Sequence, residues 1–318
     1  MPSIPGTVKK PVLTHFLCIP LAATPAARAQ LAASLSAFRN DVCAPPARGG
    51  FDVPEDAVRP VGTVHLTLGV MSFPTAPKGR DGGGGSGVEG LQRARELLAG
   101  LGLRSIWREV VRGRQGDAVR RLEGMARERG GVGAPVARKE RREEQGEERL
   151  REKEEGVVVE EEERDEEEEE RPRITLRGLA SMQPADKAAV LYAPPVDPFG
   201  LLQAFCEKVR DVFREAGLMV DEGRPLLLHA TVVNTVYVKG GRNERGGGGG
   251  KGGGGRKGGK KWERLVLDAR GIIDRYEDQV WLENMPLEKV AICKMGAKKT
   301  MVDGVEDEAY EVEAEVNF

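Results

Sequence analysis

Short apolar runs and amphipathic stretches follow one another along this chain, and each predicts an element of secondary structure. Runs rich in β-branched and other apolar residues predict strands, at 14–21, 64–71, 174–179, 188–192, 226–233, 289–295 and 310–316. Apolar residues spaced three and four apart predict helices, at 88–100, 201–217, 269–283 and from residue 25 onward. The pattern therefore indicates a mixed α+β protein.

Two of the predicted helices have recognisable ends. Thr24 before Pro25 is a typical N-cap followed by proline. The positions of this helix that we expect to face inward are Ala27, Leu31, Leu35 and Phe38. Asp197 and Pro198 precede the second helix in the same way, and Gly217 ends it. Its inward positions are Leu201, Leu202, Phe205, Val209, Val212 and Phe213.

Two segments interrupt this pattern. Arg, Glu and Gly dominate residues 108–172, and residues 240–261 are almost wholly Gly, Lys and Arg. Segments of such composition bury too little apolar surface to offset the entropy lost on ordering. We therefore expect both to be disordered insertions. An interaction arm for a protein or nucleic acid is the alternative for the first, and the second is a basic linker that can attract RNA.

A repeat appears when the two insertions are set aside. Strand, helix, loop and a histidine-bearing strand occur once before the charged insertion and once after it. We expect a single domain over 11–318, with one α+β lobe at about 11–107 and a second at about 173–318. Clefts usually form where two such units meet, so the paired strands are expected to line one.

The histidine-bearing strands contain the same tripeptide pattern, His-x-Thr. His65 and Thr67 begin the first of these strands, and His229 and Thr231 lie in the second. Side chains at i and i+2 of a strand point to the same side. If the two strands lie together, two imidazoles and two hydroxyls converge on one point.

Such a group of side chains suits phosphodiester cleavage. One neutral and one protonated imidazole can act as base and acid near neutral pH without a metal, and threonine hydroxyls can hydrogen-bond the phosphate oxygens. A lone histidine in a strand is more often structural, and we interpret His15 in that way. For His65 and His229 the repeated context favours a catalytic site. A metal site there is the weaker alternative, because neither strand offers Asp, Glu or Cys at ligand spacing.

Composition indicates the cellular compartment in which the protein is expected. Charged residues make up 31% of the chain and aromatic residues 5%, and the formal net charge is -2. The cysteines are far apart and lack metal-ligand spacing, and they are Cys18, Cys43, Cys206 and Cys293. Free thiols of this kind indicate a reducing compartment. No apolar run reaches 18 residues, so we expect no membrane span and no secretion. Nucleus or cytoplasm is expected, with the nucleus favoured.

The two motifs and their surroundings resemble the 2H phosphoesterase superfamily, which is defined by two His-x-Thr/Ser motifs. Within it, the chain is similar to the branch of phosphoesterase domains found in A-kinase anchor protein 7 and in activating signal cointegrator 1 complex subunit 1. The segments that carry this similarity are 190–193, 205–218, 228–235 and 267–270. The resemblance extends over most of 11–103, 173–239 and 262–318.

The resemblance implies a bilobal, pseudo-symmetric LigT-like fold, with an antiparallel sheet and helices in each lobe and the motifs in the central cleft. It also implies chemistry without a metal or other cofactor on RNA ends or 2′,3′-cyclic phosphates. By position, His65 and His229 become the acid–base pair, and Thr67 and Thr231 bind phosphate. The resemblance does not assign the two roles between the histidines.

Two functions remain open on the sequence. The first is a 2H phosphodiesterase, a hydrolase acting on RNA or cyclic-phosphate nucleotides, within a transcription-coactivator or alkylation-repair complex. The second is a non-catalytic RNA-binding or scaffold subunit of such a nuclear complex, associated with a helicase-type partner. Loss of turnover in histidine variants would favour the first, and a helicase partner retained by a double histidine variant would favour the second.

Overall fold

A computed structural model gives the structure of the chain and describes residues 11–74, 85–128, 171–238, 265–302 and 304–318. The helices are α1 (Pro25–Val42), α2 (Gly85–Ala99), α3 (Leu103–Glu128), α5 (Leu201–Glu215) and α6 (Arg270–Arg275). The strands are β1 (His15–Pro20), β2 (His65–Met71), β3 (Arg173–Arg177), β4 (Ala180–Ser181), β5 (Val190–Ala193), β6 (Ala230–Asn234), β7 (Val280–Pro286), β8 (Lys289–Lys294), β9 (Lys298–Val302), β10 (Val305–Ala309) and β11 (Val312–Asn317).

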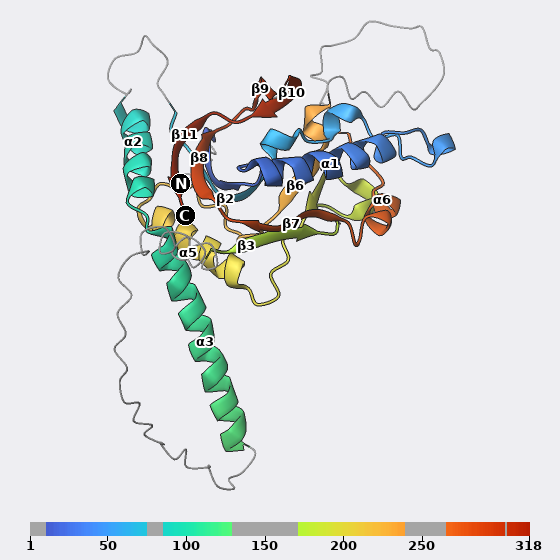
Figure 1. Cartoon of the computed structure of the whole chain (residues 1–318). Coiled ribbons are helices and arrows are strands. Elements are labelled where there is room, and N and C mark those ends of the chain that lie inside the picture. The colour runs from blue at the N-terminus through green and yellow to red at the C-terminus, as the bar shows by residue number, and fades with distance from the viewer. Residues whose placement is uncertain (1–10, 75–84, 129–170, 239–264, 303) are drawn as a thin grey trace, which may run out of the picture.

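A seven-stranded antiparallel sheet organises the fold, with strand order β11-β8-β1-β2-β6-β5-β4. The unit β1-α1-β2 and the unit β5-α5-β6 lie on either side of the sheet's middle, where β2 meets β6. The single pair Leu66 and Ala230 joins these two strands. Two short antiparallel pairs, β9 with β10 and β3 with β7, complete the architecture. The α+β class and the repeated strand–helix–strand unit are thus confirmed (Figure 1).

The two repeated units share one sheet, and the end of the chain joins the first of them. We expected residues 289–318 in the second lobe, but β8 and β11 extend the sheet on the side of β1. Local sequence patterns do not reveal this pairing, because β8 and its partner β1 are widely separated in the sequence. The half that carries His65 is therefore built from both ends of the chain.

The prediction of a helix over 269–283 was wrong in its second half. Helix α6 ends at Arg275, and β7 follows from Val280. Trp281 and Leu282 are both 1% exposed, and Leu282 pairs with Leu176 of β3. Tertiary packing of these two large side chains on neighbouring elements overrides the helical spacing.

The prediction that the disordered insertion begins at residue 108 was also wrong, because α3 continues through 103–128. Val110 is buried, and the Trp107 ring lies 6.0 Å from that of Phe205 on α5. The apolar positions at the beginning of the helix therefore pack on α5, and the polar turns that follow extend from this anchored end (Figure 1). The expected disorder of residues 129–170 and 240–261 lies outside the described residues.

The main core lies on one face of the large sheet, and helices α1, α2 and α5 contribute side chains to it. Helix α1 packs on β7 and α5 packs on β2, and all inward positions expected for α1 are buried. Leu66 and Ala230, at the junction of the two halves, belong to this core and are 0% exposed. A separate small cluster of Phe16, Cys18, Ala291 and Cys293 lies outside it. The alternation of side chains therefore places this small apolar cluster on the opposite face at β1 and β8, and it places His65 and Thr67 on that face at β2.

Thr24 caps α1 as expected, since its Oγ1 accepts a hydrogen bond of 3.1 Å from the backbone N–H of Ala27. We predict that Thr24→Ala lowers the free energy of unfolding by about 1 kcal/mol, because this N–H then loses its partner. Urea unfolding followed by circular dichroism measures the change. Thr24→Ser keeps the acceptor and should retain most of the stability, and equal losses in both variants would contradict a capping role.

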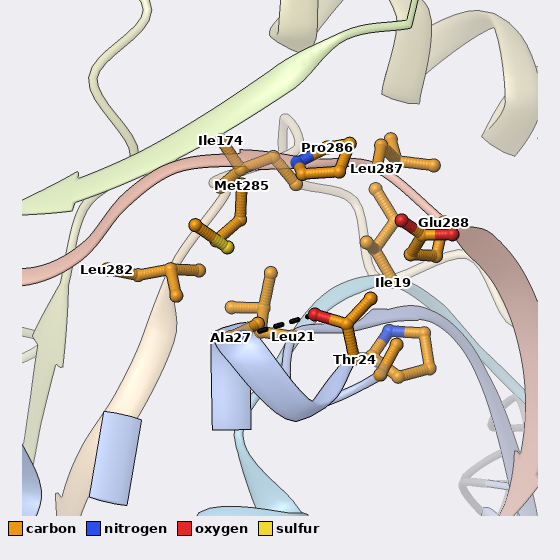
Figure 2. A pocket seen from close by; sticks show the side chains of 12 residues that line it. Ile19, Leu21, Thr24, Ala27, Ile174, Leu282, Met285, Pro286, Leu287 and Glu288 are labelled. Atoms are coloured by element: carbon orange, nitrogen blue, oxygen red, sulfur yellow. Dashed lines mark hydrogen bonds between the residues drawn. The ribbon is translucent and has the colours of Figure 1, made fainter. Parts of the chain in front are cut away.

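A small pocket lies between the start of α1 and β7 (Figure 2). Its lining is apolar apart from Thr24 and Glu288, and the Thr24 hydroxyl is already engaged as the helix cap. The pocket offers neither an acid–base pair nor a set of hydrogen-bond donors for a substrate.

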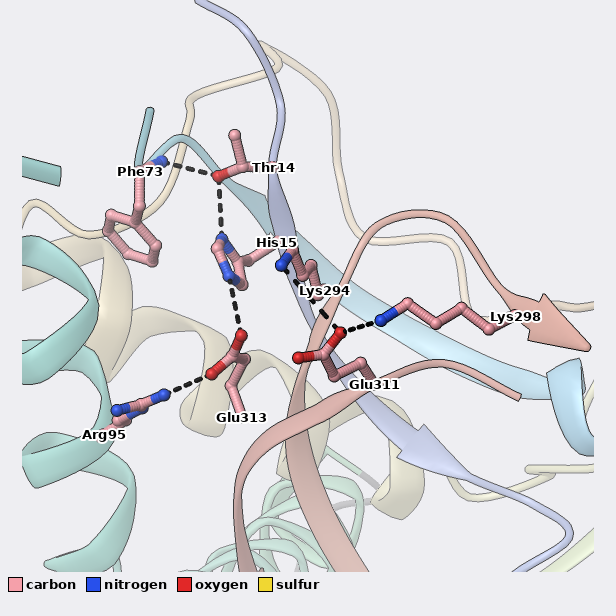
Figure 3. Close-up of polar contacts among 8 residues, drawn as sticks. All are labelled: Thr14, His15, Phe73, Arg95, Lys294, Lys298, Glu311 and Glu313. Carbon is pink, nitrogen blue, oxygen red and sulfur yellow. Dashed lines mark hydrogen bonds and ion pairs between the residues drawn. The ribbon is translucent and has the colours of Figure 1, made fainter. Parts of the chain in front are cut away.

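His15 belongs to a buried network that attaches α2 to the sheet (Figure 3). Its Nδ1 lies 2.8 Å from the Thr14 hydroxyl and its Nε2 lies 3.7 Å from Glu313 of β11. Glu313 also forms an ion pair with Arg95 of α2. These contacts give His15 a structural role, which agrees with the interpretation of a lone histidine.

Candidate active site

The two His-x-Thr motifs lie side by side at the centre of the sheet. β2 and β6 run antiparallel with Leu66 opposite Ala230, so in this register His65 lies across from Thr231 and Thr67 lies across from His229. Leu66 and Ala230 face the core, and their neighbours on both sides therefore face the other way. The structure thus brings all four sequence-predicted residues onto one open face. The second strand begins at Ala230 instead of 226, which leaves His229 immediately before it.

Both imidazoles make the same hydrogen bond. The Nδ1 of His65 lies 2.7 Å from the carbonyl oxygen of Thr63, and the Nδ1 of His229 lies 2.8 Å from that of Leu227. A carbonyl oxygen only accepts, so each Nδ1 carries a proton and donates it. In the neutral ring, Nε2 is then the basic nitrogen. Each half of the protein therefore fixes one imidazole in a single tautomer.

An aromatic ring from the neighbouring strand lies against each histidine. The Phe16 ring of β1 is 4.9 Å from that of His65, and the Tyr192 ring of β5 is 5.5 Å from that of His229. Tyr310, between β10 and β11, also contacts His65, with ring centroids 5.3 Å apart. The two imidazoles are thus held in similar surroundings by pseudo-equivalent strands.

Burial keeps both imidazoles neutral. It lowers the pKa of His65 to about 4, with smaller lowering contributions from the nearby charges of His229 and Arg59, against the hydrogen bond to Thr63 that raises it. Burial also lowers the pKa of His229, helped by the charge of Arg224 and opposed by the hydrogen bond to Leu227. A positive charge on His229 therefore opposes protonation of His65. Both rings are therefore available as bases near pH 7.

These lowered pKa values predict that acid destabilises the fold. The unfolded chain takes up protons on these histidines near pH 6.5, whereas the folded chain resists protonation until about pH 4 at His65. The stability they confer is present above pH 6.5 and is lost as the pH falls towards 4. Urea unfolding at pH 7.5 and pH 5 measures the loss. His65→Gln should reduce the decline, and a stability that rises on acidification would contradict the prediction.

A carboxylate behind the first motif fixes the turn that precedes it. Asp307 of β10 accepts a 3.1 Å hydrogen bond from the Gly62 N–H and forms an ion pair with Arg28 of α1. A Cβ on Gly62 would lie 2.5 Å from the carbonyl oxygen of Glu308, so only glycine fits this close approach. The β9–β10 hairpin therefore holds the turn that leads into His65.

Three further residues at the His65 end of the site were missed by the sequence analysis. Arg59 is 4% exposed, and its guanidinium lies 3.8 Å from the ring centre of Tyr237. Tyr310 interacts with both of them, and burial raises its pKa to about 12, with Tyr237 raising it further and the charge of Arg59 lowering it. Arg59 lies in a loop and Tyr310 in a distant closing segment, so no local pattern points to either residue.

Among the described residues, no three His, Cys, Asp or Glu side chains come together as a possible metal site. The hydroxyls of Thr67 and Thr231 make no hydrogen bond with any described residue. By contrast, the Thr235 hydroxyl donates to the carbonyl oxygen of Leu265 at 2.6 Å. The two motif hydroxyls are thus free to hydrogen-bond a ligand.

An antiparallel α+β fold with a His-x-Thr motif at each of its two central strands is the arrangement of the 2H phosphoesterase class. The family model described as AKAP7 2'5' RNA ligase-like domain matches residues 139–318, which is more than half of the chain. The chain therefore belongs to this family. The matched segment contains His229 and Thr231, whereas His65 and Thr67 precede it.

One curated relative comes from Schizosaccharomyces pombe (strain 972 / ATCC 24843). The chain is 30% identical over 112 residues to this protein, Uncharacterized protein C15D4.13c, over 35% of the chain and 42% of the relative. The match therefore spans less than half of the relative's length.

Two solved structures align over nearly the whole chain. A phosphoesterase is 13% identical with a TM-score of 0.35, over 97% of this chain and 98% of that one. LigT of E. coli, solved in complex with 3'-AMP, is 12% identical with a TM-score of 0.35, over 96% and 97%. The family assignment itself rests on the family model and on the two motifs.

Proposed function

We propose that this protein is a metal-independent 2H phosphodiesterase that acts on RNA ends or 2′,3′-cyclic nucleotide phosphates. The observation that carries the proposal is the pair of equivalent imidazoles, each held through Nδ1 by the carbonyl two residues earlier. Across from each imidazole lies the threonine of the other motif, in the register set by Leu66 and Ala230. Family membership supports a nucleotide substrate.

In this proposal the reaction needs only side chains of the site. The neutral Nε2 of one imidazole takes a proton from water as the water oxygen bonds to phosphorus. The bond from phosphorus to one ribose oxygen breaks, and the protonated imidazole of the other motif gives its proton to that oxygen. Acid–base assistance of this kind accelerates a reaction by about 10² to 10⁴-fold. The hydroxyls of Thr67 and Thr231 stabilise the charge that grows on the free phosphate oxygens.

Both lowered pKa values fit these roles when substrate is present. A bound phosphate is an anion, and an opposite charge close to an imidazole favours its protonated form. Substrate therefore promotes protonation of one ring, and the second ring stays neutral as the base. The result is an acid–base pair that the substrate itself completes.

The test is cleavage of short RNAs that end in a 2′,3′-cyclic phosphate, carried out in EDTA. Turnover with release of a single phosphomonoester end supports the proposal, and the position of that phosphate shows which ribose oxygen leaves. A parallel reaction that supplies RNA with a free 5′ hydroxyl distinguishes hydrolysis from ligation. RNA that binds without any turnover would overturn the enzymatic proposal in favour of an RNA-binding subunit.

The wider assignment to a nuclear transcription-coactivator or alkylation-repair complex stays a prediction from the resemblance, as does a helicase-type partner. In the parts of the chain that the structure describes, no helix has both the length and the apolar character needed to cross a bilayer. Purification of the tagged full chain from nuclear extract tests the prediction. A helicase subunit that copurifies in equal amount with wild type and with the double histidine variant would support it.

A further inference from the structure

Arg59 is a buried cation without an anionic partner in the part of the chain that is described. It is 4% exposed, and its Nη2 is shielded from solvent and has no hydrogen-bond partner there. No described carboxylate forms an ion pair with it. Leaving a buried charged donor unpaired is unfavourable and calls for an explanation, such as an absent ion or ligand.

The backbone fixes Arg59 beside the second motif strand. Its N–H donates to the carbonyl oxygen of Val232 at 2.8 Å, and Val58 forms an isolated antiparallel bridge with Val233. Thr231 is the residue before Val232 and faces the site. The backbone at Arg59 is thus paired with β6, next to the junction of β2 and β6. This pairing fixes the position of the residue beside the site.

The guanidinium lies at the His65 end of the open face. Tyr310 connects the two residues, because its ring contacts the His65 ring and the charge of Arg59 acts on its hydroxyl, lowering the pKa of Tyr310. The charge of Arg59 also acts on the His65 imidazole. A phosphate between the two motifs would therefore be next to this cation.

Tyr237 covers the guanidinium. Its ring centre is 3.8 Å from the central carbon of Arg59, yet the side chain is 42% exposed. The tyrosine ends a one-turn helix at Thr235–Tyr237 that directly follows β6. A ring stacked on a cation is a weaker partner than a phosphate that accepts charge-assisted hydrogen bonds.

We propose that Arg59 is a phosphate-binding residue of this site, covered by the Tyr237 ring in the free protein and uncovered when a phosphate-bearing nucleotide enters. The proposal rests on the proposed function for the location of the phosphate, and it names a contact beyond the two motifs. A guanidinium presents two parallel N–H groups to phosphate oxygens. Substrate then supplies the anion that the free protein lacks.

Binding of inorganic phosphate and of 3′-AMP, measured by titration calorimetry on the full chain, tests this inference. Arg59→Met should weaken the binding of both by about tenfold or more, and Arg59→Lys, which keeps a positive charge, should lose less. Arg177→Met, which removes an exposed arginine on β3, is the matched control and should bind as wild type. Unchanged phosphate affinity in folded Arg59→Met or, if that variant does not fold, in Arg59→Gln, which also removes the charge, would overturn the proposal.

Substitution of Tyr237 tests separately whether its ring covers the Arg59 guanidinium in the free protein. Tyr237→Ala should bind inorganic phosphate several-fold more tightly because no ring competes for the cation, whereas Tyr237→Phe should bind it as wild type does. Weaker phosphate binding by Tyr237→Ala would show that the ring contacts the ligand and would overturn its role as a cover. A further outcome separates the two proposals. If Arg59→Met loses phosphate binding but the wild type shows no diesterase activity, the phosphate contact is supported and the proposed reaction is not.

Discussion

Turnover of an RNA 2′,3′-cyclic phosphate is expected to fall by about 10² to 10⁴-fold in His65→Ala and in His229→Ala. In the proposed mechanism each substitution removes one member of the acid–base pair, and the remaining imidazole cannot both accept and donate a proton within one step. The double variant should be scarcely slower than either single variant, because two groups that act as one unit are not additive. Single-turnover kinetics in EDTA measures the effect on the chemical step.

His15 supplies the matched control for these variants. It is the one histidine of the chain outside the two motifs, and it lies in the buried network with Glu313 and Thr14. His15→Gln should lower stability but leave the rate constant for cleavage unchanged in folded protein. Wild-type turnover in either motif variant would contradict the two-histidine mechanism, and equal losses in all three variants would point to a general effect on folding.

Much of the fold could be predicted because its strongest signals are local. The Thr24 cap and the spacing of the inward side chains define α1 within one stretch of sequence. The repeated His-x-Thr pattern likewise indicated two equivalent strands, and the structure places them in contact. Patterns of this kind depend on period and capping, which a sequence displays directly.

The elements that were missed depend on contacts between distant residues. β8 joins β1 through a register that no local period encodes, and the start of α3 packs on α5 through Trp107 and Phe205, which are far apart in the sequence. Arg59 and Tyr310 reach the site in the same way, through the bridge of Val58 to Val233 and through the closing segment. Tertiary pairing decides such positions, and propensity alone does not.

The second large effect concerns the motif threonines. Thr67→Val and Thr231→Val are each expected to lower the rate constant for cleavage by about 10²-fold, because in the proposed mechanism each removes a donor to the phosphate oxygens. Neither hydroxyl is engaged with a described residue, and valine keeps the branched shape that suits a strand. The loss should therefore appear in catalysis more than in stability, which thermal unfolding measures in parallel.

Two comparisons separate phosphate stabilisation from packing. Thr67→Ser and Thr231→Ser keep a hydroxyl and should retain most of the activity, although they lose the methyl group that valine preserves. Thr235→Val removes a hydroxyl close to the second motif, but that hydroxyl is bound to the carbonyl of Leu265. It should therefore destabilise the protein and leave the rate constant for cleavage of the folded fraction unchanged. If Thr67→Val and Thr231→Val behave like Thr235→Val, the motif hydroxyls are structural and the phosphate is held by other donors, with Arg59 the first to test.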